Sequence, residues 1–227
     1  MTRIVAGTWG GRTLEVPARG TRPTSERVRE AIFSRLTHLG IVGGGRGSVR
    51  VLDLYAGSGA LALEAASRGA SHITLVEAAR PAAATARRNL ANLGARGAVE
   101  QVAVDRYLTR APDTPWDLVF CDPPYDIPEV ELGAALAALA RPGVLAPGAT
   151  VVVERTRRAP APRWPAGWDD VARRDYGETV VYYAVVPRAV AQLSAVRGDR
   201  DGTPVIRPRR RSEAVGGPGE PGLPDTS

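Results

Sequence analysis

Val51-Leu-Asp-Leu-Tyr-Ala-Gly-Ser-Gly59 is the stretch on which the fold of this 227-residue chain depends. Residues 49–54 are mostly aliphatic, which is typical of a strand buried on both faces of a parallel sheet. Gly57 and Gly59 permit a sharp turn, and a helical pattern begins at Ala60, where unpaired N–H groups would face the same crevice. The stretch predicts a strand, a loop and a helix that bind a nucleotide-like ligand, although short glycine patterns are often plain turns.

The overall composition predicts one α/β domain with a small appendage. The chain has a single cysteine, Cys121, and two histidines, so a disulfide framework is excluded and a zinc site lacks ligands. No run approaches the roughly 18 to 20 apolar residues that span a bilayer, and the N-terminus has no apolar leader segment. We therefore expect a cytoplasmic monomer without a metal and without a membrane partner.

Positive charge is concentrated at the N-terminal end. All 30 basic residues are arginines, and residues 1–48 carry eight of them against three acids. Two β-prone runs, 3–7 and 12–16, surround Gly10-Gly11 and predict a hairpin with Trp9 beside the turn. A helix then runs to about residue 36, with Thr24 or Ser25 as its N-cap. A basic segment of this kind is typical of a protein that binds a polyanion.

Three arginines gather around the start of this helix: Arg22, Arg27 and Arg29. They form either a solvated basic face or an edge that grips phosphates beside the glycine loop, and we favour the second interpretation.

The next strands end in acidic residues. The run 73–77 predicts a second buried strand with Glu77 at its tip, about 20 residues beyond the loop, where an acid accepts hydrogen bonds from ribose hydroxyls. A helix follows from about Pro81 to residue 93. The run 99–104 predicts a third strand ending at Asp105-Arg106, where the acid would meet the exocyclic amine of an adenine.

The fourth strand, 116–121, leads into Asp122-Pro-Pro-Tyr125. The prolines have no N–H to donate, so the Pro123 carbonyl is available to a substrate; Asp122 adds a carboxylate acceptor and Tyr125 a flat ring. The tetrapeptide therefore predicts a cradle for a planar molecule whose amino group donates both of its hydrogens and aims its nitrogen lone pair at an electrophile. Cys121 directly before it is interpreted as a core residue, not as a nucleophile.

The rest of the chain completes the predicted architecture. A helix at 130–140, a strand at 150–154 and a hairpin of 168–176 with 179–185 supply a closing antiparallel strand, which dehydrogenase sheets lack. Residues 197–227 are rich in glycine and proline without apolar periodicity, so we interpret them as a disordered tail. The expected organisation is an N-terminal basic hairpin and helix extension (1–48), a catalytic domain (49–190) and this tail.

The motif Asp53-x-x-Ala-Gly-Ser-Gly59 followed by Asp122-Pro-Pro-Tyr125 resembles the class I S-adenosylmethionine-dependent amino-methyltransferases. The segments Arg3-Ile-Val-Ala-Gly7 and Arg22-Pro-Thr-Ser-Glu-Arg-Val-Arg-Glu-Ala-Ile-Phe33 resemble the RsmD family in particular, which methylates the exocyclic 2-amino group of a guanine in 16S ribosomal RNA. The resemblance covers roughly residues 3–185. It implies an α/β, class I methyltransferase Rossmann-like sheet with helices on both faces, an antiparallel last strand and a small N-terminal hairpin and helix extension.

The resemblance also implies roles for individual residues. The cofactor would be S-adenosyl-L-methionine, bound through its amino-acid part, its ribose and its adenine. The residues implied to bind it are Asp53, Tyr55, Ala56, Gly57, Ser58, Gly59, Glu77, Asp105 and Arg106. Arg106 stands where the family pattern has a small residue. The catalytic motif would be Asp122, Pro123, Pro124 and Tyr125. The implied contacts to 16S ribosomal RNA or the small ribosomal subunit are Arg3, Trp9, Arg12, Arg22, Arg27 and Arg29.

Three other functions remain open at this point. A DNA adenine-N6 methyltransferase shares the tetrapeptide, but no segment is large enough for a separate target-recognition domain. A protein-glutamine methyltransferase more often has Asn in place of Asp122 and has no need of a basic N-terminus. A non-enzymatic RNA- or nucleotide-binding module would use the same loop without the catalytic motif.

Overall fold

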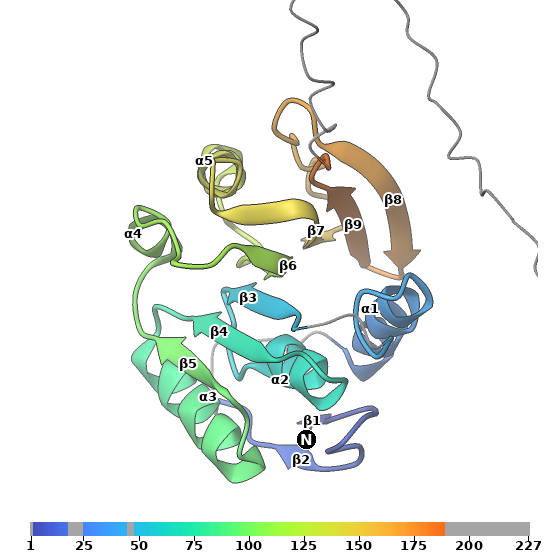
Figure 1. The fold of residues 1–227 in the computed structure, drawn as a ribbon, viewed down its shortest axis with the longest axis vertical. Coiled ribbons are helices and arrows are strands. Elements are labelled where there is room, and N and C mark those ends of the chain that lie inside the picture. The colour runs from blue at the N-terminus through green and yellow to red at the C-terminus, as the bar shows by residue number, and fades with distance from the viewer. Residues whose placement is uncertain (1, 18–24, 45–47, 189–227) are drawn as a thin grey trace, which may run out of the picture. The chain divides into compact units, whose positions relative to one another are not determined.

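The aliphatic run of the opening stretch is an inner strand of a seven-stranded sheet in the computed structural model, which describes residues 2–17, 25–44 and 48–188. The sheet order is β5-β4-β3-β6-β7-β9-β8 (Figure 1). Its strands are β3 (Arg50–Leu54), β4 (His72–Val76), β5 (Gly97–Glu100), β6 (Trp116–Cys121), β7 (Leu145–Thr156), β8 (Asp169–Tyr176) and β9 (Thr179–Val185). The first five are parallel, and β9 pairs antiparallel with both β7 and β8. The predicted antiparallel last strand is therefore confirmed.

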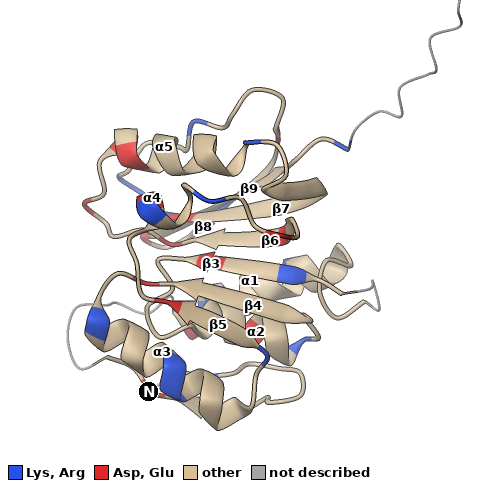
Figure 2. Cartoon of the chain, turned by 60° about the vertical axis from the view of Figure 1, so that its left-hand side comes forward, with Lys and Arg blue, Asp and Glu red and all other residues tan. Residues whose placement is uncertain are grey.

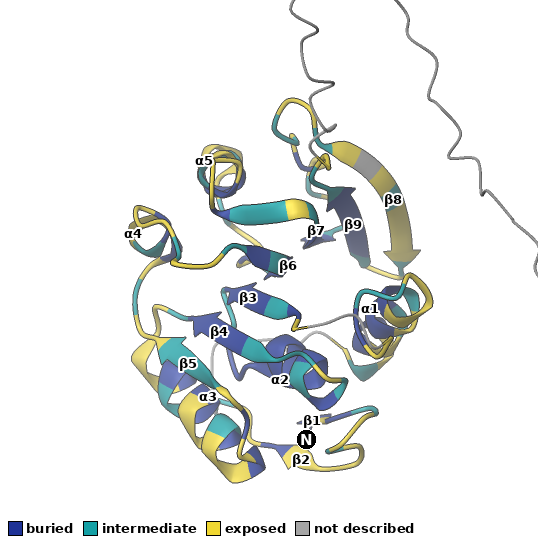
Figure 3. Ribbon diagram, in the orientation of Figure 1, coloured by how far each residue is buried: buried dark blue, intermediate teal, exposed yellow. Residues whose placement is uncertain are grey.

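Helices cover both faces of the sheet, as predicted (Figure 1). Three helices, α1 (Glu26–His38), α2 (Ala60–Ser67) and α3 (Arg80–Leu93), lie on one face, and α4 (Val104–Tyr107) and α5 (Glu129–Leu139) lie on the other. Alternate residues of each strand enter one of two buried apolar clusters; Val51 joins the first cluster and Leu52 the second. In Figure 3 the strands β3, β4 and β6 and the helix α2 are largely buried, whereas the edge strand β5 is only partly covered and α3 exposes its outer side.

The N-terminal hairpin is present but shorter than predicted. Its strands are β1 (Thr2–Arg3) and β2 (Thr13–Leu14), paired in antiparallel register. They stop early because the backbone bonds elsewhere: the N–H groups of Val5 and Ala6 donate to the Glu64 carboxylate of α2 at 2.6 and 3.1 Å. These bonds anchor the hairpin to the helix that begins at the glycine loop.

The third predicted strand was placed wrongly. The strand β5 covers 97–100 in place of 99–104, because its partner β4 ends at Val76, which pairs with Glu100, and no strand continues beyond. Asp105 consequently lies in the short helix α4 and not at a strand tip.

Helix α1 begins as predicted, with the Ser25 hydroxyl accepting a hydrogen bond from the Val28 N–H at 3.2 Å. The alternative cap Thr24, the predicted RNA contact Arg22 and the predicted tail 197–227 lie outside the described residues. Within the described residues, no helix combines the length and the apolar character that crossing a bilayer requires.

Candidate active site

A cavity of about 1200 Å³ opens at the carboxyl ends of β3, β4 and β6. Strand order reverses at β3, and the crevice at such a reversal is where ligands bind in open α/β sheets. Most of the residues expected at a site line this cavity, namely Asp53, Tyr55, Ala56, Gly57, Ser58, Glu77, Asp105, Asp122, Pro123, Pro124 and Tyr125. The structure thus brings the glycine loop and the tetrapeptide, more than 60 residues apart in sequence, to one place.

The loop between β3 and α2 adopts the sharp turn that its glycines permit. Gly57 and Gly59 have φ values of 56° and 82°, and Tyr55 shares this left-handed conformation with a φ of 62°. Gly59 does not line the cavity; it caps α2, and a side chain there would overlap that of Leu75. Its role is to bring the loop close to the sheet.

Glu77 holds the glycine loop from the neighbouring strand end. One carboxylate oxygen accepts the Gly57 N–H at 2.9 Å, and the other accepts the Ala79 N–H at 2.7 Å. Each oxygen keeps a second lone pair, so the carboxylate can still accept hydrogen bonds from a ligand.

Asp53 is a carboxyl buried in the floor of the cavity, with 1% of its surface exposed. Its Oδ2 accepts the Ala62 N–H of α2 at 3.1 Å, while Oδ1 has no hydrogen-bond partner among the described residues. Burial raises the pKa of Asp53 to about 8; the Ala62 hydrogen bond opposes this rise, and the charges of Asp122 and Glu77 add to it. Within the part of the chain that the structure describes, Oδ1 of this carboxyl therefore has no hydrogen-bond partner.

The tetrapeptide presents its acceptors at the end of β6. The Pro124 carbonyl closes a turn by accepting the Ile127 N–H at 3.1 Å, whereas no backbone N–H of the described residues donates to the Pro123 carbonyl. Tyr125 is 56% exposed at the cavity. Cys121 is buried, and burial raises the pKa of its thiol well above the ordinary range, which suits a core residue.

The cavity walls also include residues that sequence reasoning missed. One side of α5 contributes Val130, Glu131, Ala134, Ala135 and Ala138. Their spacing along a helix directly after the tetrapeptide was an available signal, because such a helix must pass the end of the sheet. Val16 is also part of the wall, although it lies just beyond the N-terminal hairpin and no local pattern indicated this role.

The charged residues that line the cavity are all acidic. Its carboxyl groups belong to Asp53, Glu77, Asp105, Asp122, Asp126 and Glu131, and none of its described lining residues is an arginine or a histidine. Such a site favours a ligand that carries positive charge. Searched over the described ranges, the chain has no group of three or more His, Cys, Asp or Glu that could hold a metal ion.

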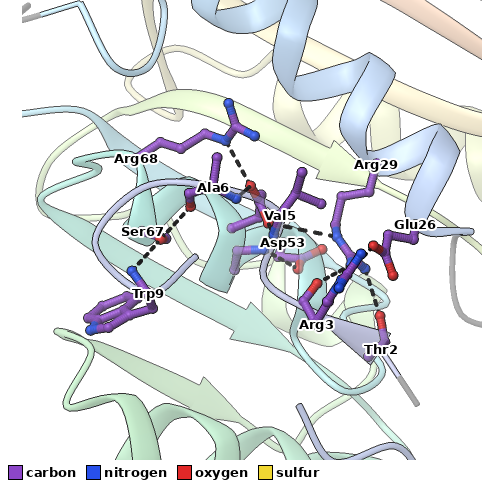
Figure 4. A network of polar contacts seen from close by, with 12 residues as sticks. Thr2, Arg3, Val5, Ala6, Trp9, Glu26, Arg29, Asp53, Ser67 and Arg68 are labelled. Atoms are coloured by element: carbon purple, nitrogen blue, oxygen red, sulfur yellow. Dashed lines mark hydrogen bonds and ion pairs between the residues drawn. The ribbon is translucent and has the colours of Figure 1, made fainter. Parts of the chain in front are cut away.

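One predicted RNA contact is wrong. Arg29 is 0% exposed, so its guanidinium cannot reach a polyanion; it donates to the Thr2 hydroxyl at 3.1 Å and to the Arg3 carbonyl, and lies 3.9 Å from the Glu64 carboxylate (Figure 4). The sequence shows the charge of Arg29 but not its position on the inward side of α1. Arg29 joins the hairpin, α1 and α2.

The other N-terminal candidates lie at or near the surface. Arg3 and Arg27 are exposed, and Arg3 pairs with Glu26 at 2.8 Å. Exposed Arg12 donates to the Asn92 carbonyl of α3 at 3.0 Å. Trp9 is half-buried and packs against the core, with its backbone N–H bonded to Ser67. Arg106 is exposed but does not line the cavity, so its expected cofactor contact has no support in the lining.

Replacing Glu77 by alanine is expected to weaken cofactor binding by about 1 to 3 kcal/mol, the scale of hydrogen bonds to a charged group. The loss has two causes, because the variant removes an acceptor for the ligand and also releases the Gly57 N–H that Glu77 holds. Calorimetric titration with S-adenosylmethionine measures the effect. Glu100→Ala is the matched control, since Glu100 ends the adjacent strand β5, is exposed and does not line the cavity. Equal affinities for both variants would remove Glu77 from the site.

Comparisons with known proteins identify the family to which this chain is similar. Residues 2–185 match the family model described as conserved hypothetical protein 95. The chain is 37% identical over 167 residues to ribosomal RNA small subunit methyltransferase D of Escherichia coli, covering 73% of this chain and 80% of that protein. The Haemophilus influenzae protein of the same name is 34% identical, over 70% of this chain and 80% of its own length. The solved structure of the Escherichia coli protein yhhF superposes with a TM-score of 0.71 and 35% identity, over 82% of this chain and 98% of that one.

Proposed function

Because this chain belongs to the RsmD family, described as conserved hypothetical protein 95, we propose that it transfers a methyl group from S-adenosylmethionine to the exocyclic 2-amino group of a guanine in 16S ribosomal RNA. The class of enzyme is that of its relatives, a methyltransferase. The finer assignment to the guanine amino group rests on one observation: Asp122 and the Pro123 carbonyl, two hydrogen-bond acceptors, lie in the same cavity as the glycine loop.

The residues of the cavity fit the proposed cofactor. S-adenosylmethionine carries a sulfonium and an ammonium group, and the cavity has six carboxyl groups and no arginine or histidine among its described lining residues. Among the described residues the buried Oδ1 of Asp53 has no hydrogen-bond partner, and a cationic ligand would provide one. In this proposal Asp53 and the glycine loop hold the amino-acid part, Glu77 the ribose and Asp105 the adenine region.

The catalytic task of the chain is mainly to position the target amine. When bound, S-adenosylmethionine supplies an electrophilic methyl group. Asp122 and the Pro123 carbonyl accept hydrogen bonds from the amine, which favours a pyramidal nitrogen whose lone pair is less delocalised into the ring. Tyr125 offers a stacking surface to a guanine splayed out of its helix, which offsets part of the cost of unstacking.

The expected RNA contacts belong to the basic N-terminal segment. Of the residues proposed for this role, Arg3, Arg12 and Arg27 are exposed, Trp9 is half-buried, and Arg22 lies outside the described residues. Basic residues also lie on α3 (Figure 2), where Arg87 and Arg88 are exposed, and Arg12 bonds to the Asn92 carbonyl of the same helix. Phosphate contacts of this kind place the RNA without reading its sequence.

Neutralising Arg12, Arg22 and Arg27 together to glutamine is expected to weaken binding of small ribosomal subunits and to flatten its dependence on salt. Each lost phosphate contact should lower the slope of log K against log salt by about 0.7 to 0.9, because fewer counterions are released. Filter binding over a salt series measures the slope. Arg158→Gln is the control, since Arg158 is exposed but lies outside the N-terminal segment. An unchanged slope in the triple variant would place the RNA surface elsewhere.

Cofactor affinity is expected to rise with pH from about pH 6 toward about pH 8 and not beyond, because an α-ammonium group loses its charge near pH 8. The Asp53 carboxyl, whose pKa is raised to about 8 by burial, must lose its proton to interact with a cation, so binding releases a proton below that pKa. The same shift lowers the stability of the ligand-free protein as pH rises from about 4 to about 8, because the folded chain keeps a proton that the unfolded chain has lost. Calorimetry in buffers of different ionisation enthalpy measures the released proton, and Asp53→Asn should abolish it. A pH-independent affinity in the parent protein would contradict this assignment.

A direct activity assay separates the proposal from its alternatives. Labelled S-adenosylmethionine is offered with small ribosomal subunits, with adenine-containing duplex DNA and without a substrate. We expect label in RNA only; label in DNA would favour an adenine methyltransferase, and cofactor binding without any transfer would favour a binding module.

A further inference from the structure

Asn89 is a buried amide of α3 with every hydrogen bond made to main-chain atoms of two distant segments. The residue is 2% exposed. Its Oδ1 accepts the Glu15 N–H at 2.8 Å, and its Nδ2 donates to the Glu15 carbonyl at 2.9 Å and to the Ser58 carbonyl at 3.0 Å. Both amide hydrogens and the amide oxygen are thus used. A single side chain therefore connects the N-terminal segment to the glycine loop.

The two connected segments both contribute to the lining of the same cavity. Ser58 belongs to the loop proposed to hold the cofactor, and Val16, the residue after Glu15, lines the cavity. Val16 is 41% exposed, Tyr125 56% and Val130 77%, and all three line the cavity. Exposed apolar side chains gathered around one opening indicate a surface for a planar apolar group such as a nucleobase.

We propose that Asn89 is a positioning residue that couples the glycine loop to residues 15–16, which include the cavity-lining Val16. Through this coupling, the cofactor and the RNA would strengthen each other's binding. The proposal rests on the proposed function in taking RNA as the substrate. A buried amide cannot move from one partner without leaving another unsatisfied, which costs more than the bond itself contributes. Any ligand that fixes the Ser58 carbonyl therefore also favours one position of residues 15–16.

The coupling must act in both directions, because linkage between two bound ligands is reciprocal. A purely structural role for Asn89, in which it only staples the N-terminal segment to α3, predicts loss of stability without any change in this linkage. The exposed ion pair between Glu15 and Arg88, at 2.7 Å, already joins the same two elements, so the segment has a second attachment when Asn89 is replaced.

The test compares RNA binding with and without S-adenosylhomocysteine, which occupies the cofactor site but cannot donate a methyl group. Small ribosomal subunits from a strain that lacks the gene serve as the RNA probe. In the parent protein we expect S-adenosylhomocysteine to raise RNA affinity about fivefold or more. Asn89→Asp keeps the size and the acceptor of the side chain but loses both amide hydrogens. In this variant the ratio of the RNA affinity with S-adenosylhomocysteine to the RNA affinity without it should fall toward one. The affinity for S-adenosylhomocysteine alone should change much less.

Asn92→Ala is the matched control, because Asn92 is an exposed asparagine of the same helix and bonds to Arg12 only through its backbone carbonyl. It should keep the parent ratio. A ratio of one in the parent protein, or a full ratio in Asn89→Asp, would overturn the proposal. Failure of the proposed function would look different, since the parent protein would then transfer no label from S-adenosylmethionine to the subunits.

A measurement on the parent protein alone covers the case in which Asn89→Asp does not fold. The Glu15 amide donates to Asn89, so its hydrogen exchange should slow when S-adenosylhomocysteine binds. Unchanged exchange at Glu15, alongside slower exchange in the glycine loop, would show that the loop and the N-terminal segment are not coupled.

Discussion

Asp122→Ala is expected to lower the rate of methyl transfer by about 10²-fold or more, the usual effect of removing one well-placed electrostatic group from an active site. Asp122 lies at the end of β6 and lines the cavity that also contains the glycine loop. Its proposed hydrogen bond to the target amine matters most while the methyl group moves. Turnover measured with saturating cofactor and RNA should therefore fall, while the affinity for S-adenosylmethionine stays within a few-fold of the parent value.

Two further variants make this expectation specific. Asp122→Asn keeps the shape and one acceptor, so partial activity should remain. Asp126→Ala is the matched control, because Asp126 is an exposed carboxylate that also lines the cavity but has no proposed contact with the amine. Parent activity in Asp122→Ala would end the catalytic interpretation. A parallel loss of cofactor affinity would show that Asp122 mainly shapes the cofactor site.

Glu64→Ala is expected to lower the free energy of unfolding by about 3 to 5 kcal/mol, because it leaves a buried charge without its partner. Glu64 and Arg29 are both 0% exposed, and Glu64 also pairs with Arg68 at 2.8 Å. Burial lowers the pKa of Arg29, and the negative charge of Glu64 opposes that effect. The variant also removes the acceptor of the Val5 and Ala6 N–H groups.

Chemical denaturation measures the free energy of unfolding of Glu64→Ala and of its matched control Glu15→Ala. Glu15 makes an ion pair of similar length with Arg88, at 2.7 Å, but both side chains are about half exposed. Exposed pairs of this kind contribute only about 0 to 1 kcal/mol, so Glu15→Ala should change stability little. Equal effects of the two variants would show that the buried cluster does not hold the hairpin to α2.

Local sequence signals were sufficient for the inner part of the sheet. Strands β3 and β6 lie within a residue of their predicted positions, because parallel strands buried on both faces are continuous apolar runs. Helix α3 begins one residue before Pro81 and ends one residue before Gly94, and a proline in the first turn and a glycine after the last are typical marks of a helix start and a helix end. The glycine loop and the tetrapeptide could be placed together because the carboxyl ends of parallel strands meet at one edge.

Contacts between distant residues could not be predicted in this way. Strand β5 ends at Glu100 for lack of a partner strand, which the apolar run beyond it does not reveal. Glu64 and Asn89 bond to residues of the N-terminal segment 58 to 74 positions away, and only Glu64, the one charged residue of a mostly apolar helix, offered a hint. Arg29 appeared to be one more basic residue of a surface helix, because its burial depends on packing against the hairpin.

The most direct test of the proposed function is to map the methyl group. Small ribosomal subunits from a strain that lacks the gene are incubated with the purified protein and S-adenosylmethionine labelled in its methyl group, and the RNA is then digested and its nucleosides separated. We predict label in 16S ribosomal RNA, on the exocyclic 2-amino group of guanine, with transfer strongly reduced by Asp122→Ala. Label on adenine, on DNA or on ribosomal protein, or no transfer to subunits that the protein binds, would contradict the account.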